Sequence, residues 1–237
     1  MQARGLRKAR SGLIGMVVPA HFNRFFSSMS QIFEAHARAR GMCPVVVSTL
    51  RDPDEERRTV ETLISYAIDA LFIVGATDPD ALSDICSAAN LAHVNVDLPG
   101  SKAPSVVSNN YRGAQQLTRQ LIVNMPAVAE PARGKAYFLG GSARDHASGR
   151  RFAAFRDVVL ERVGRFDDDQ LIECGYAPRS ATTAIEALSQ RIGGLPAALF
   201  VNSLTAFEGV MSYFVRLPPQ AFQSSVIGCF DYDPFAA

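Results

Sequence analysis

The sequence predicts an α/β protein of two sequential lobes, each a parallel sheet flanked by helices. Short aliphatic and β-branched runs alternate with longer amphipathic stretches along the chain. Runs such as Leu71–Val74 are apolar at consecutive positions, which is typical of strands covered on both faces. The segment 124–134 holds two prolines and a glycine and interrupts the alternation near mid-chain. Together these observations favour two Rossmann-like lobes with right-handed crossovers.

The apolar runs predict strands over 13–18, 44–48, 70–75, 93–97, 106–108, 136–140, 197–201 and 226–230. Eight such strands would also fit a closed α/β barrel. The interruption near mid-chain favours separate lobes instead. We therefore expect a linker over 1–11, a first lobe over 12–123, a connection over 124–133 and a second lobe over 134–237.

The stretches between these runs predict helices. Met29, Ile32 and Phe33 follow the 3.6-residue period of a helix, and Gly41 supplies a stop signal. Acidic residues at 54–56 favour the positive end of a helix dipole. The expected helices cover about 27–41, 54–67, 79–91, 111–123, 148–163, 180–192 and 203–216.

Composition excludes several classes of protein. Of the 237 residues, 48% are apolar and 20% charged, which argues against disorder, and no apolar run is long enough to cross a membrane. Four of the 24 basic residues lie in the first ten, which hold no acid, so 20 remain against 23 acidic ones. The body is therefore a poor binder of polyanions, whereas residues 1–10 form a basic arm.

The cysteines, Cys43, Cys86, Cys174 and Cys229, lie far apart and form no C-x-x-C motif. Their spacing predicts neither a metal site nor a redox motif, and isolated thiols favour a cytoplasmic protein. The basic arm followed by residues 13–20 could instead be a short signal peptide. Pro19 interrupts that run, and no cleavage motif follows it.

Candidate ligand-binding residues follow the expected strands, because open α/β sheets bind ligands beyond the carboxyl ends of their strands. Between two lobes that edge predicts a cleft. In the first lobe, Phe25 and Phe26 cannot both face the core at a helix start, so one is free to stack on a ligand. Asp97 ends the fourth strand and can accept hydroxyl hydrogen bonds, as polyols require.

In the second lobe, the loop from Gly140 to Arg151 joins a strand to a helix start, and its arginines favour an anion or a hydroxylated ligand. It matches neither the dinucleotide nor the P-loop pattern. At other strand ends, Tyr176 can stack on a sugar ring, Ser203 can donate and Asp231 can accept. No known catalytic motif is present, so we predict no catalytic residue and no cofactor. An α/β enzyme using the 140–151 loop for a phosphorylated substrate stays open as an alternative.

The residues resemble the effector-binding core of the LacI/GalR family of bacterial transcriptional regulators, a fold like type I periplasmic binding proteins. The resemblance runs from about residue 2 to residue 237, in matching order and spacing. Its main segments are 13–19 with 23–26, 68–75, 94–97, 108–114, 137–141, 151–155, 197–200 and 226–231. The stretch 198–211 is most similar to fructose-type repressors. Leu98, Asn109 and the pair Ser203-Leu204 depart from the family pattern.

This resemblance implies a sugar or sugar phosphate effector and a regulator whose lobe closure changes DNA affinity. It assigns effector contacts to Phe25, Phe26, Asp97, Arg151, Tyr176, Ser203 and Asp231. Arg4, Leu6 and Arg7 match the DNA-contacting hinge helix, with Leu6 as the minor-groove wedge.

The resemblance also implies a homodimer that binds operator DNA through an N-terminal helix-turn-helix headpiece. The 237 residues hold no such headpiece, and the family continues beyond their C-terminal end. A periplasmic sugar-binding protein of the same two-lobe build is the alternative from another class.

Overall fold

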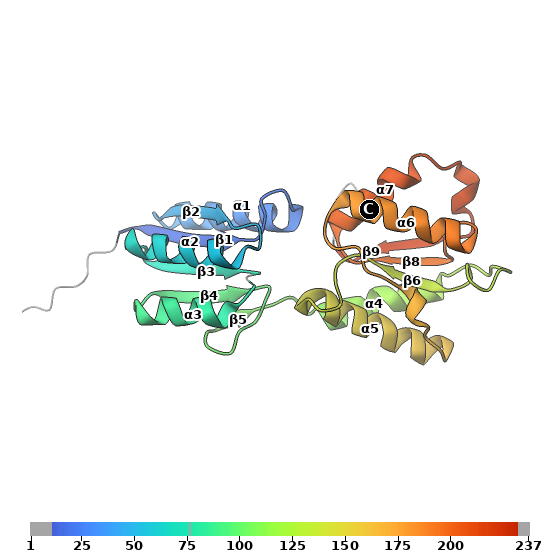
Figure 1. The fold of residues 1–237 in the computed structure, drawn as a ribbon, viewed down its shortest axis with the longest axis horizontal. Coiled ribbons are helices and arrows are strands. Elements are labelled where there is room, and N and C mark those ends of the chain that lie inside the picture. Colours follow the sequence, from blue (N-terminus) through green and yellow to red (C-terminus); the bar gives the residue numbers. More distant parts are fainter. Residues whose placement is uncertain (1–10, 76, 232–237) are drawn as a thin grey trace, which may run out of the picture. The chain divides into compact units, whose positions relative to one another are not determined.

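The computed structural model describes residues 11–75 and 77–231, and the chain divides into two compact units, residues 1–108 and 109–237 (Figure 1). The expected hinge residues Arg4, Leu6 and Arg7 lie outside the described residues. Within the described part, no helix combines the length and apolar character needed to cross a bilayer.

Unit 1 is built on a five-stranded sheet in the order β2-β1-β3-β4-β5, with every pair parallel. Its strands are β1 Leu13–Val18, β2 Cys43–Ser48, β3 Ala70–Val74, β4 Ala92–Val96 and β5 Ser105–Val106. Its helices are α1 Arg24–Ala39, α2 Pro53–Ser65 and α3 Pro79–Ala88.

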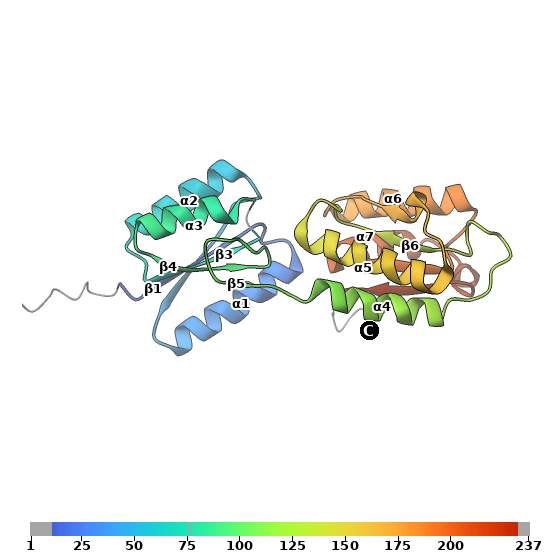
Figure 2. The same ribbon diagram turned by 90° about the horizontal axis from the view of Figure 1, so that it is seen from below.

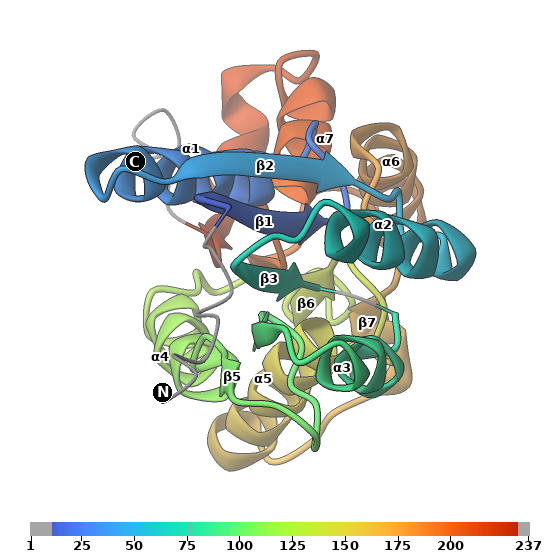
Figure 3. The same ribbon diagram turned by 90° about the vertical axis from the view of Figure 1, so that its left-hand side faces the viewer.

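Helices cover both faces of this sheet, as the apolar strand runs predict. On one face, Val17, Leu71 and Ile73 pack against α2 and α3. On the other, Met16, Val18 and Val74 pack against α1, and Figures 2 and 3 show α1 and α2 on opposite sides of the sheet. Side-chain caps start these helices: Asn23 accepts from the backbone of Phe25, and Asp52 caps α2.

Unit 2 is built on a four-stranded parallel sheet in the order β7-β6-β8-β9. Its strands are β6 Ala136–Leu139, β7 Leu171–Ile172, β8 Ala198–Val201 and β9 Val226–Cys229. Its helices are α4 Asn110–Val123, α5 His146–Val163, α6 Pro178–Ile192 and α7 Leu204–Phe214, and a 3₁₀ turn over Asp168–Gln170 precedes β7.

The core of unit 2 is aromatic on one face of the sheet and mainly aliphatic on the other. Phe138 and Phe200, side by side on β6 and β8, stack with ring centroids 4.8 Å apart, and Phe155 of α5 packs against both. Leu139 and Val201 pack against α6 and α7 on the opposite face. The sheet is thus enclosed between two helical layers, which explains why its strands are apolar at consecutive positions.

The two separate parallel sheets confirm the predicted fold class and exclude a closed barrel. All expected strands and helices are present, and β7 is the strand that sequence periodicity missed. It has only two residues, too few for a pattern.

The boundary between the units differs from the expected lobes. α4, expected in the first lobe, packs against α5, β8 and β9 of unit 2, with Ala114 and Leu121 in its core. The division therefore falls between Ser108 and Asn109, not in the proline-containing segment 124–133. That segment is a connection within unit 2.

Burial gives a testable ranking of thiol reactivity. Cys43 is exposed, whereas burial raises the pKa of Cys86 and of Cys174 to about 11 and that of Cys229 to about 12. Because the thiolate is the nucleophile, these three thiols hold about one part in a thousand or less of reactive form at pH 8. Ellman's reagent should therefore label Cys43 rapidly and the others only after denaturation.

Cys43→Ser should abolish the fast reaction in the folded protein while leaving the total after denaturation lower by one thiol. Two or more fast thiols in the native wild-type protein would contradict this ranking.

Candidate functional site

Both sheets reverse their strand order at one point, and each reversal marks where a ligand-binding crevice is expected. In unit 1 the chain leaves β1 for β2 on one side and returns to β3 on the other. In unit 2 the same reversal lies between β6 and β8. Ligands in open α/β sheets bind beyond the carboxyl ends of the strands at such points.

In unit 1, Phe26 and Asp97 come together at this edge around Gly75. Gly75 has φ of +55°, and a Cβ placed on it would lie 3.5 Å from Cζ of Phe26 and 3.6 Å from Oδ2 of Asp97. Phe26 is buried and Phe25 half-buried, with their rings edge to face at 5.2 Å. One phenylalanine therefore belongs to the core, as the sequence predicts, and Phe25 retains exposed ring surface.

The loop that follows Asp97 is held in place by Asp80 of α3. The Asp80 carboxylate accepts hydrogen bonds from the hydroxyl of Ser101 at 2.6 Å and from the backbone of Ser101 and Lys102 at 2.7 and 3.2 Å. The Ser101 hydroxyl and these amides lower the pKa of Asp80. This anchoring fixes the connection between β4 and β5 at the same edge as Asp97.

In unit 2, two glycines let the start of the loop after β6 approach β8 closely. Gly140 and Gly141 have φ of +113° and +64°. A Cβ on Gly141 would collide with the side chains of Asn202 and Ser148. The loop can therefore pass between the end of β8 and the start of α5 only because this position has no side chain.

A chain of hydrogen bonds crosses this edge and orients Tyr176. The Asp145 carboxylate can only accept, so the Tyr176 hydroxyl donates to it. Ser148 then donates to Tyr176 over 3.1 Å, and the amide of Asn202 donates to Ser148 over 2.9 Å. The Tyr176 side chain is thus held from its hydroxyl end.

Arg151 lies at the centre of the same edge, and its side chain is only 10% exposed. Its Nε donates to Oδ1 of Asn110 at 2.8 Å, and its Nη1 donates to the backbone carbonyl of Asn202 at 2.6 Å. The guanidinium lies over the ring of Phe230, 3.8 Å from the centroid. Nη1 is 4.0 Å from the carboxylate of Asp231. Four neighbours therefore offset the cost of burying this charge.

Asp231 and Ser203 both bind the beginning of α7. Oδ2 of Asp231 accepts from the backbone of Leu204 at 3.0 Å, and the hydroxyl of Ser203 accepts from the backbone of Ala206 at 3.3 Å. Asp231 thereby joins the helix start to Arg151. The second-lobe residues expected from the sequence, Arg151, Tyr176, Ser203 and Asp231, are brought to one edge.

The effector contacts expected from the sequence do not include four members of this edge: Asn110, Asp145, Ser148 and Asn202. Asp145 and Ser148 lie inside the polar loop that was singled out, and Asn202 follows a strand, so their positions carried a usable signal. Asn110 carried none, because it comes from the helix assigned to the other lobe. Conversely, Arg144 and Arg150 of the loop are exposed, and Arg150 stacks on Tyr111 at 4.9 Å.

The chemistry of these two edges is that of hydrogen bonding to hydroxyl groups. They present carboxylates, the guanidinium of Arg151, hydroxyls and aromatic rings, which together can accept from, donate to and stack on a polyhydroxylated ligand. Among residues 11–75 and 77–231, no group of three histidine, cysteine or acidic side chains lies close enough to hold a metal ion.

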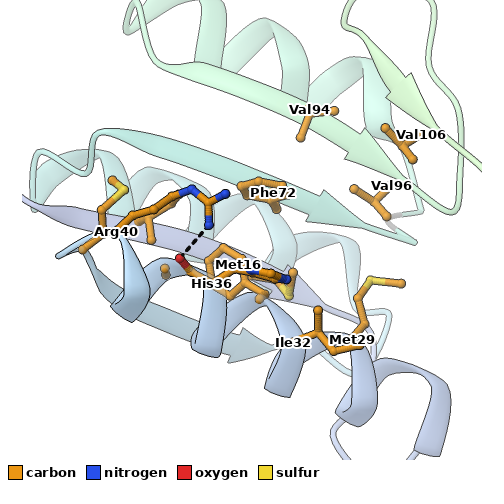
Figure 4. Close-up of a pocket in the computed structure, with 13 residues that line it drawn as sticks. Met16, Met29, Ile32, His36, Arg40, Phe72, Val94, Val96 and Val106 are labelled. Atoms are coloured by element: carbon orange, nitrogen blue, oxygen red, sulfur yellow. Dashed lines mark hydrogen bonds between the residues drawn. The ribbon is translucent and has the colours of Figure 1, made fainter.

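A cavity of about 490 Å³ in unit 1 is a different feature. It lies between α1 and the sheet, with Met29 and Ile32 on the helix side and Phe72 and Val94 on the strands (Figure 4). His36 and Arg40 are its polar residues, joined by a hydrogen bond from Arg40 to the His36 carbonyl at 3.0 Å. Its lining lacks the converging polar groups that a sugar needs, so the strand-end residues remain the better site.

Comparison with known proteins matches residues 14–235 to the family described as periplasmic binding protein domain. The ribitol operon repressor of Klebsiella aerogenes is 43% identical over 123 residues, covering 52% of this chain and 46% of the repressor. The catabolite repressor/activator of Escherichia coli K12 is 31% identical over 229 residues, covering 90% of this chain and 62% of that protein. The chain thus spans about half to three-fifths of these relatives.

Among solved structures, a Cra transcriptional dual regulator from Pseudomonas putida, in complex with fructose 1-phosphate, superposes with a TM-score of 0.81. The two are 21% identical, and the match covers 95% of this chain and 81% of the other. This similarity confirms the fold. The relatives and the structure named here are regulators and not enzymes.

The hydrogen-bond chain through Tyr176 gives a second prediction. Tyr176→Phe should lower the free energy of unfolding by about 1–2 kcal/mol, because buried Ser148 loses its acceptor and Asp145 a donor. Urea unfolding measures the change. A double-mutant cycle with Ser148→Ala should give a coupling of about 0.5–1.5 kcal/mol.

Tyr213→Phe is the matched control, because the Tyr213 hydroxyl makes no hydrogen bond within the described residues. It should change stability by less than about 0.5 kcal/mol. Equal effects of the two substitutions would show that the chain through Tyr176 contributes nothing.

Proposed function

The chain belongs to the periplasmic binding protein domain family, in the form that LacI/GalR-type regulators use as effector-binding core, and we propose that it senses a small polyhydroxylated effector for such a regulator. The observation that carries this proposal is the edge of unit 2, where Arg151, Asp231 and Tyr176 converge on a strand-order reversal. Their donors, acceptors and ring match the groups of a sugar or polyol.

In this proposal the effector contacts Phe25, Phe26 and Asp97 from unit 1 and Arg151, Tyr176, Ser203 and Asp231 from unit 2. Because the contacts come from two units, the effector binds one arrangement of them more tightly than others. That difference in affinity shifts the population of the arrangements. In a homodimer the shift alters how the hinge residues Arg4, Leu6 and Arg7 engage operator DNA, through linkage between the two sites.

The whole regulator then acts in the cytoplasm and binds DNA through a helix-turn-helix segment outside these 237 residues. The relatives whose names describe them as repressors support this proposal. The name of the 43% identical relative makes ribitol the first effector to test, and sugars follow from the convergent polar edge.

A periplasmic sugar-binding protein is the second candidate, and the description of the matched family favours it. It predicts export and removal of a signal peptide. Mass spectrometry of the N-terminus of the native protein separates the two: an intact basic arm supports the regulator, and cleavage near residue 20 supports export.

Thermal-shift and calorimetric titrations test the sensor function directly. Ribitol, D-ribose or D-fructose at about 100 times its Kd should stabilise the protein by about 2.7 kcal/mol. Arg151→Gln and Asp97→Asn should each weaken binding at least about tenfold, because each removes a charged hydrogen-bonding group.

Asp168→Asn is the control, because this exposed carboxylate precedes β7, at the opposite edge of the sheet from Arg151. It raises the net charge by one, as Asp97→Asn does, and should leave affinity within about twofold. Absence of binding by any sugar or polyol at millimolar concentration would reject the proposed function.

A further inference from the structure

The charged groups at the edge of unit 2 decide how it would receive a neutral or a phosphorylated ligand. Carboxylates of the chain itself already accept hydrogen bonds from backbone N–H groups that a bound phosphate would use. Glu173 accepts from the backbone of Ala143 in the loop before α5. Asp231 accepts from the backbone of Leu204 at the start of α7. Helix starts and loops are the usual cradles for phosphate, and here two of them hold acids.

The start of α5 at this edge is also beside an acid. α5 begins after Asp145, whose carboxylate turns to the Tyr176 hydroxyl instead of capping the helix. A phosphate placed at this start would therefore lie next to a carboxylate. Like charges this close repel, and water screens the repulsion poorly in a partly buried site.

The buried cation at this edge does not balance a phosphate. Arg151 already donates hydrogen bonds to Asn110 and to the Asn202 carbonyl. Its guanidinium also lies over the ring of Phe230 and pairs with the Asp231 carboxylate. A phosphoryl group that approached this guanidinium would also approach Asp231. A hydroxyl group meets no such penalty, because it can donate to Asp231 while accepting from an arginine N–H.

One buried polar atom at this edge favours a ligand that carries hydroxyl groups. The side-chain carbonyl of Asn202 is fully buried and has no hydrogen-bond partner among the described residues. The neighbouring amide is committed to Ser148. An unpaired buried acceptor is satisfied by a donor, which a ligand hydroxyl or a water supplies.

We infer that the effector is an uncharged polyhydroxyl compound, and that Asp231 and Asp145 are the specificity-determining residues that exclude its phosphate esters. This inference rests on the proposed sensor function and narrows its ligand to one of two chemical classes. Asp97 in unit 1 adds a further strand-end carboxylate to the proposed site.

The test compares each neutral compound with its own phosphate ester by isothermal titration calorimetry. D-Fructose is paired with fructose 1-phosphate, D-ribose with ribose 5-phosphate and ribitol with ribitol 5-phosphate. For the pair that includes the tightest neutral ligand, the parent compound should bind at least about tenfold more tightly than its ester.

Two variants test whether Asp231 and Asp145 cause the difference in affinity between parent compound and ester. Asp231→Asn and Asp145→Asn each remove one negative charge and keep a hydrogen-bonding side chain, so each should narrow the gap between parent and ester at least about threefold. Both variants are tested because Asp231 also accepts a hydrogen bond at the start of α7, so Asp231→Asn alone could fail to fold. Asp168→Asn should leave the gap unchanged.

The possible outcomes distinguish a wrong ligand class from a wrong function. An ester that binds as tightly as its parent, or more tightly, overturns the inference and leaves the sensor function standing. A gap that neither variant narrows overturns the assignment to these two aspartates. Failure of every parent and every ester to bind rejects the sensor function itself, and the inference with it.

Discussion

Parallel pairing of β6 with β8 is the constraint on which the candidate site in unit 2 depends. Leu139 lies opposite Val201, so both strands end at one level and their next residues, Gly140 and Asn202, meet there. The absence of side chains at Gly140 and Gly141 lets the two backbones approach. Asn202 can then accept from Arg151 through its backbone and donate to Ser148 through its side chain.

Around this junction the protein holds a charge that is costly to bury. A guanidinium as little exposed as that of Arg151 is tolerated only when its N–H groups find hydrogen-bond acceptors and its charge is offset. Asn110, Asn202, Phe230 and Asp231 together provide this. The same contacts fix the orientation of the Arg151 side chain before any ligand binds. This reduces the loss of side-chain entropy on binding.

Sequence patterns located the regular elements well, because apolar periodicity reflects burial directly. They failed where an element is short or where assignment depends on distant packing. β7 has two residues and no period of its own. α4 has an ordinary amphipathic pattern, and nothing in that pattern tells which sheet it covers. The prolines at 126 and 131 suggested a boundary, yet they lie in a connection inside unit 2.

The sequence by itself determined the class of fold, the edge at which polar residues gather and most of the residues there, since strand direction and strand ends can be inferred from local pattern. Only the tertiary structure decided which of those residues interact. Arg150 and Arg151 are neighbours in the chain, but Arg150 is exposed and stacks on Tyr111 of α4, whereas Arg151 is buried among partners from three segments. The physical reason is that burial and charge compensation depend on residues far apart in sequence, which only the packed sheet and helices bring together.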